Sequence, residues 1–210
     1  MMLLKLLVGS VAVAGTCLCQ PPVVRCNTAT SQYRSKIIRS KSLQAFTLTE
    51  AQIFGKWGCA NTARLYIAAK DQPFRVVYSM APLRSDDTGD SLQPIAWSPD
   101  GNLLAIEALY RPQTGSDAAA FGLLLYDARN GHTEEVNSDF SSDVSRAEHR
   151  VCEVVLRSVQ GFSDSGKVIL ELADAVDEEQ HSHACIGKES KWLFDPGTRH
   201  IVSASALARR

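Results

Sequence analysis

One short phrase occurs twice in this 210-residue chain, and it constrains the fold more than any other feature. The first copy reads IAWSPDG over residues 95–101 and is followed by the apolar run LLAI over 103–106. The second copy reads QGFSDSG over residues 160–166 and is followed by VIL over 168–170. Each copy predicts a strand ending in an aromatic residue, a tight turn closed by glycine, and a second strand. A repeated unit of strands cannot bury its own faces, so the units are expected to stack on one another.

Two further strands are predicted after each copy. Tyr126 and Asp127 end a third strand in the first unit, and Phe194 and Asp195 do so in the second. A polar turn then leads into a fourth strand. The two predicted units, and a hairpin before them, cover these ranges: 92–137, 152–204 and 63–79. Helix signals are nearly absent after residue 60, and residues 138–150 are expected to form a long polar connection.

The phrase WSPDG at residues 97–101, with the Tyr126-Asp127 pair beyond it, resembles the repeat of TolB-like β-propellers. The resemblance implies four-stranded antiparallel blades, each with this phrase between its first and second strands. Two units and a leading hairpin make two and a half blades, or three if residues 43–58 contribute strands. Closed propellers use four or more blades. We therefore expect an all-β, incomplete propeller-like stack, with a β-sandwich as the alternative.

The recurring aromatic and acidic residues are predicted to be scaffold rather than a functional site. Trp97 and Phe162 occupy the same place in the two copies, so both are expected to pack between sheets. Asp100, Asp127 and Asp195 follow strands, where a carboxylate accepts hydrogen bonds from turn amides. We expect no catalytic residue among them.

The first nineteen residues have the pattern of a secretory signal peptide. Lys5 supplies the positive charge, and an apolar stretch over residues 6–19 follows it. Cleavage is predicted after Cys19, and lipidation of Cys17 is the alternative. No later stretch is long and apolar enough to span a bilayer. The sequence therefore predicts a periplasmic or secreted protein.

Four cysteines remain after this segment: Cys26, Cys59, Cys152 and Cys185. An even number in an oxidising compartment predicts two disulfides, and four cysteines allow three pairings. Their order along the chain favours Cys26–Cys59 and Cys152–Cys185, because each bridge then stays within one local unit. The alternative is buried free thiols.

Residues 20–42 are predicted to be a polar linker, and residues 43–210 a single β domain. The linker carries four closely spaced basic residues: Arg34, Lys36, Arg39 and Lys41. A solvated arm is expected, and an acidic partner or a membrane surface is the alternative. Tyr33 is the only aromatic residue in this arm, so single-stranded nucleic acid is not an expected ligand.

His181 and His183 are the candidate metal ligands of the chain. They alternate in sequence, so in a strand both imidazoles would lie on one face. A third ligand would come from Glu179 or His200. Cys185 could not serve as a thiolate ligand if it formed a disulfide. The alternative is a solvated acidic loop with no metal.

Other enzyme motifs are missing from the sequence. Ser163 lacks the glycine that a nucleophile elbow needs two residues later, and a strand rather than a helix is predicted after it. No glycine-rich phosphate loop and no cofactor motif occurs. We therefore expect an exported, non-enzymatic module that binds a protein partner or itself, rather than a small-molecule substrate. The alternatives are a small exported metal-dependent hydrolase using His181 and His183, and an inhibitor or immunity protein against a secreted enzyme.

Overall fold

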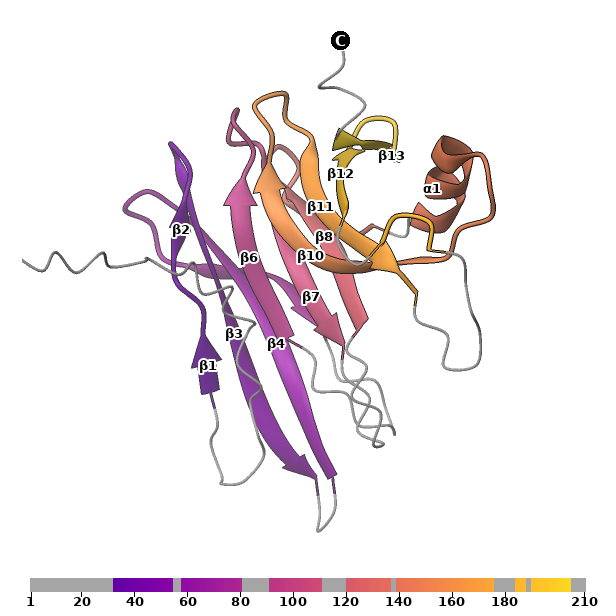
Figure 1. The fold of residues 1–210 in the computed structure, drawn as a ribbon. Coiled ribbons are helices and arrows are strands. Elements are labelled where there is room, and N and C mark those ends of the chain that lie inside the picture. Colours follow the sequence, from indigo (N-terminus) through magenta and orange to yellow (C-terminus); the bar gives the residue numbers. More distant parts are fainter. Residues whose placement is uncertain are drawn as a thin grey trace, which may run out of the picture.

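Both copies of the repeated phrase form a strand, a glycine-closed turn and a second strand in the computed structural model. Gly101 and Gly166 have φ angles of +77° and +78°, a left-handed conformation that glycine adopts without a Cβ clash. The structure describes residues 32–54, 58–80, 91–110, 120–136, 139–175, 184–187 and 190–204. The fold is all-β, with three antiparallel sheets and one short helix (Figure 1).

Each sheet follows the chain order of its strands, as in a propeller blade. The first sheet contains β1 (Gln32–Arg34), β2 (Ile38–Arg39), β3 (Leu43–Phe54), β4 (Gly58–Ala69) and β5 (Arg75–Met80). The second contains β6 (Ser91–Trp97), β7 (Leu103–Tyr110), β8 (Ala120–Asp127) and β9 (His132–Glu135). The third contains β10 (Val154–Phe162), β11 (Val168–Asp174), β12 (Ser190–Asp195) and β13 (His200–Ser203).

The first sheet is more complete than the sequence predicted. Both β1 and β2 pair with β3, so these two short strands together occupy the place of one outer strand. The expectation of a linker is therefore wrong for the part of residues 20–42 that forms β1 and β2. Residues 43–54 form one long strand, which completes a third antiparallel sheet.

Helix α1 (Phe140–Glu148) lies in the region where a polar connection was predicted, so that prediction is wrong. Asp139 caps the helix by accepting a hydrogen bond from the Ser142 backbone N–H at 3.0 Å. His149 ends it with a left-handed φ of 55°. Phe140 and Val144 lie four residues apart and face the core between the second and third sheets.

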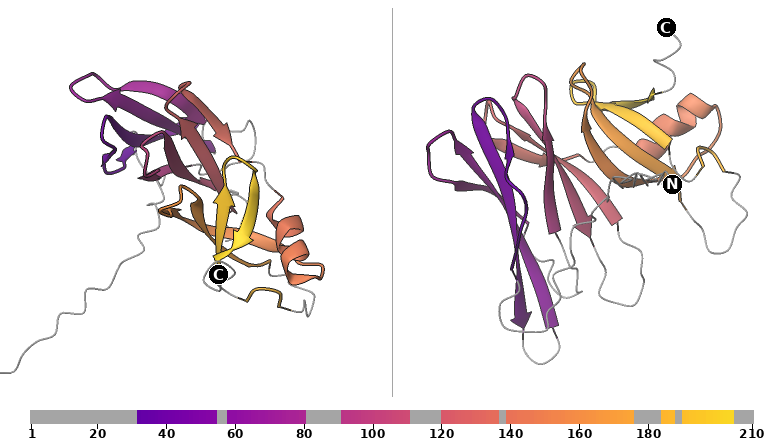
Figure 2. Two further views of the ribbon diagram at one scale, coloured as in Figure 1. Left: turned by 90° about the horizontal axis from the view of Figure 1, so that it is seen from above. Right: turned by 60° about the vertical axis from the view of Figure 1, so that its left-hand side comes forward.

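The second sheet is covered on both faces because the first and third sheets lie on either side of it (Figure 2). Leu104, Ile106 and Leu124 face the first sheet, whereas Ala105 and Leu123 face the third. All five are at most 1% exposed. A strand buried on both faces needs apolar residues at successive positions, which explains the continuous apolar runs of β7 and β8.

The two copies of the repeat differ by one residue in the turn. Trp97 pairs with Leu104, whereas Phe162 pairs with Val168, which is one position earlier in its copy. Leu104 and Val168 then pair with equivalent aromatic residues, Tyr126 and Phe194. Residues of β7 and β11 that lie on the same face are therefore matched only when β11 is shifted by this one residue relative to β7.

Candidate binding surfaces

The repeated aromatic residues occupy matching environments. Trp97 and Tyr126 pack in the core between the first and second sheets, with ring centroids 6.3 Å apart. Phe162 and Phe194 pack in the core between the second and third sheets. These residues therefore hold each sheet against the preceding one, as predicted for scaffold.

The repeated aspartates hold turns. Asp127 Oδ1 accepts the Arg129 backbone N–H at 2.9 Å, and Asp195 Oδ1 accepts the Gly197 N–H at 2.9 Å. The Arg129 side chain also donates to Asp127, which lowers the pKa of that carboxyl. These carboxylates are engaged within their own turns.

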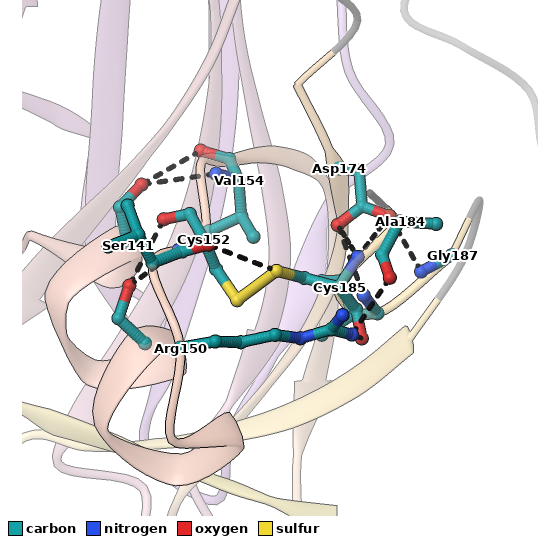
Figure 3. Close-up of a disulfide and its surroundings, with 11 residues drawn as sticks. Ser141, Arg150, Cys152, Val154, Asp174, Ala184, Cys185 and Gly187 are labelled. Atoms are coloured by element: carbon teal, nitrogen blue, oxygen red, sulfur yellow. Dashed lines mark hydrogen bonds between the residues drawn. A yellow bond between two sulfur atoms is a disulfide. The ribbon is translucent and has the colours of Figure 1, made fainter. Parts of the chain in front are cut away.

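The disulfide between Cys152 and Cys185 is present, with the Cα atoms 5.8 Å apart (Figure 3). The Asp174 carboxylate accepts backbone N–H groups from Cys185, Ile186 and Gly187 at 2.9 to 3.1 Å. Arg150 donates to the carbonyls of Ala184 and Cys185. The bridge and these bonds fasten the segment before β12 to the beginning of β10.

Helix α1 is fastened to the third sheet through side chains. Ser141 Oγ accepts the Val154 N–H, and Ser145 Oγ accepts the Cys152 N–H at 2.8 Å. Asp143, 6% exposed, accepts the backbone N–H of Ile201 at 2.9 Å and lies 3.1 Å from Nδ1 of His200. The structure therefore engages His200, one of the suggested third metal ligands, with a carboxylate of α1.

The remaining predicted candidates lie outside the described residues. This applies to the signal peptide (residues 1–19), to Cys26, and to the metal candidates Glu179, His181 and His183. The side chain of Cys59 also lies outside the description, so its pairing with Cys26 stays a prediction. Within the described ranges, no cluster of three His, Cys, Asp or Glu residues could hold a metal ion. No described helix is long and apolar enough to cross a membrane.

Neighbouring sheets are joined by polar contacts as well as by apolar packing. Thr47 of the first sheet donates its hydroxyl to the Leu92 carbonyl of the second at 2.6 Å. Glu107 of the second sheet accepts the Val159 N–H of the third at 2.8 Å. Glu107 is 7% exposed, and burial raises the pKa of its carboxyl. Sequence analysis missed Glu107, because one charged residue within an apolar strand gives no signal of its own.

The outer face of the third sheet points away from the second sheet and carries residues equivalent to those that the second sheet buries. With the one-residue shift in the turn, Glu171 occupies the position of Glu107. Pairing across the strands places Ile169, Leu193 and Val202 in one row, and Glu171 beside Lys191. On this face Val202 is 39% exposed, Ile169 and Glu171 are half-buried, and Leu193 is 8% exposed. We call these five residues the open face.

The outer face of the first sheet is partly covered by its own side chains, although Val76 beside Tyr66 stays 48% exposed. The Phe46 ring stacks on Tyr66, and the edge-on ring of Phe74 also contacts it, both with centroids 4.7 Å apart. The Arg34 guanidinium lies 3.9 Å from the Phe46 centroid on this face. Arg34 of the predicted basic arm thus covers an aromatic ring, which leaves Phe46 only 7% exposed.

No protein-family model matches the chain, and no curated protein matches its sequence.

Proposed function

We propose that this protein is an exported, non-enzymatic protein-binding module that binds through the open face. The observation that carries the proposal is that Glu171 and Glu107 occupy equivalent positions in the third and second sheets. At the Glu107 position the second sheet is covered by the third sheet, which supplies the Val159 N–H, whereas Glu171 is half-buried and accepts only from Ser158 and Gln160 of its own sheet. Apolar residues on an outer sheet face are candidates for an interaction surface.

A second copy of the chain is the proposed occupant. Glu171 and Lys191 are direct neighbours on adjacent strands of the open face. Under a two-fold axis, each Glu171 can face the Lys191 of the other copy, and the row of Ile169, Leu193 and Val202 can face its own equivalent. Such a face is self-complementary in charge, as a symmetric dimer requires.

The TolB-like character of the repeat is part of the same proposal. It is supported by three antiparallel sheets in chain order and by glycine-closed turns of matching conformation at Gly101 and Gly166. Export is supported by the Cys152–Cys185 disulfide, because such bonds persist in oxidising compartments.

Light scattering on the mature protein, residues 20–210, tests the proposal across a concentration series. We expect a dimer that Lys191→Glu and Glu171→Lys each weaken, because like charges then face one another. The double swap Glu171→Lys/Lys191→Glu restores the opposite-charge pairs and should restore the dimer. Val76→Glu is the matched control, since Val76 lies on the first sheet and is 48% exposed. A wild-type protein that stays monomeric at all concentrations would refute the proposed occupant.

A further inference from the structure

A cleft with a volume of about 520 Å³ opens where the turn between β2 and β3 meets the turn between β6 and β7. Small-ligand sites in proteins have volumes of roughly 300 to 1,000 Å³. The two turns touch at one side, because a Cβ on Gly101 would lie 3.6 Å from the Cβ of Ser40. The cleft therefore has walls from both the first and the second sheet.

The walls of this cleft carry uncompensated positive charge. Arg39 and Lys41 line it, and no aspartate or glutamate does so. Neither side chain has an ion-pair or hydrogen-bond partner among the residues that the structure describes. Asp100 follows the lining residue Pro99 but is engaged in its own turn, where its carboxylate accepts from Ser98 and Asn102.

The cleft also has an apolar wall. Trp97 lines it together with the partly buried Ile38 and Ile95. The Trp97 side chain is itself partly exposed, so an apolar group in the cleft can contact it.

We propose that this cleft binds a carboxylate-bearing ligand that also has an apolar part. The Arg39 guanidinium and the Lys41 ammonium would bind the carboxylate oxygens, since a guanidinium matches a carboxylate with two parallel hydrogen bonds. Trp97, Ile38 and Ile95 would contact the apolar part. The carboxylate can come from a free organic acid or from an acidic segment of a protein, because both present the same group.

This site is independent of the open face. No residue of the third sheet lines the cleft, so charge changes at Glu171 and Lys191 should not affect it. Loss of the dimer with intact carboxylate binding, or the reverse, would separate the two proposals.

Fluorescence titration of the mature protein tests the cleft, because Trp97 is itself a reporter. One arm uses hexanoate as the free acid, and the other uses a blocked peptide of alternating glutamate and leucine. The chain has three tryptophans, so Trp97→Phe is used to assign the signal. Phenylalanine is accommodated at the equivalent position by Phe162 in the other repeat, so this variant should fold.

The expected result is saturable quenching by either probe, with an affinity at least tenfold lower in Arg39→Gln/Lys41→Gln. The probe that binds more tightly identifies the source of the carboxylate. Added salt should weaken the binding. Lys36→Gln/Arg157→Gln is the matched control, because it removes two exposed positive charges outside the cleft. Equal affinity in the two double variants, or no saturable quenching by either probe, would overturn the proposal.

Discussion

The two ends of the three-sheet stack differ in how their apolar residues are covered. On the outer face of the first sheet, the Phe46 ring is covered by Tyr66, Phe74 and the Arg34 guanidinium, and Glu50 forms an ion pair with Arg64. On the outer face of the third sheet, Val202 is 39% exposed beside the half-buried Ile169 and the buried Leu193.

The difference lies in what covers the apolar residues. On the first sheet the Arg34 guanidinium covers an aromatic ring, although Val76 is 48% exposed. The third sheet instead keeps the residues of an internal unit, including a glutamate at the position where Glu107 joins two sheets. Four predictions test this contrast.

The largest effect is expected from the Cys152–Cys185 disulfide, which lies at the end with the open face. Cys152→Ala/Cys185→Ala should lower the free energy of unfolding by about 3–4 kcal/mol, because the bridge closes a loop over a sequence separation of 33 residues. Urea denaturation with and without reductant measures the loss. Reductant that destabilised the double variant as much as the wild type would show that another bond carries the effect.

The packing on the outer face of the first sheet is expected to depend on the Phe46 ring. Phe46→Ala should cost about 3 kcal/mol, because it removes a side chain that is 7% exposed and leaves Tyr66 and Arg34 without their contact. Val76→Ala on the same sheet, where the side chain is 48% exposed, should change stability by less than about 0.5 kcal/mol. Thermal unfolding of both variants gives the comparison. Equal losses would mean that the Phe46 ring is no better covered than the Val76 side chain.

Glu107 and Glu171 compare a covered and an uncovered position in the same register. Glu107→Ala should lower the free energy of unfolding by about 2 kcal/mol, because the buried Val159 N–H loses its acceptor. Glu171→Ala should cost about 0.5 kcal/mol or less, since Ser158 Oγ and Gln160 Nε2 can donate to water instead. Chemical denaturation of the monomeric state measures both. A larger loss for Glu171 than for Glu107 would contradict the assignment of inner and outer faces.

The smallest effect is a pH dependence at the covered position. Burial raises the pKa of Glu107 above its ordinary value of 4.5, so the folded protein holds this proton more tightly than the unfolded chain. The stability from protonated Glu107 is complete below pH 4.5 and is lost as pH rises through the folded pKa. Glu107→Gln cannot titrate, so its stability relative to wild type should increase over this rise. Parallel stability curves from acidic to neutral pH would argue against a buried carboxyl.

The sequence predicted the strands well where turn and strand signals agree. Asn130 and Gly131 before β9, and Pro196 and Gly197 before β13, lie in polar turns between apolar strands, and these turns occur as expected. The strands β1 and β2 were missed because their residues are polar and their conformation depends on pairing with β3.

The helix and the binding surfaces were harder to predict, for two physical reasons. Helix α1 has Phe140 and Val144 as its apolar contacts in a serine-rich segment, and its stability comes from Asp139 and from tertiary bonds. The open face depends on which residues point outward, and this is set by the single residue by which the turn after Phe162 is shorter. If all residues of the second copy are matched to the first copy with one fixed spacing, those side chains are assigned to the wrong face of the sheet.

The carboxylate of Asp143 has a consequence for how this protein can polymerise. It accepts a hydrogen bond from the backbone N–H of Ile201 on β13, so this N–H is not free to pair with a strand of another chain. Ladder growth beyond β13 is therefore obstructed by a side chain of the molecule itself. A strand of another chain could pair at this edge only by displacing the Asp143 carboxylate from Ile201.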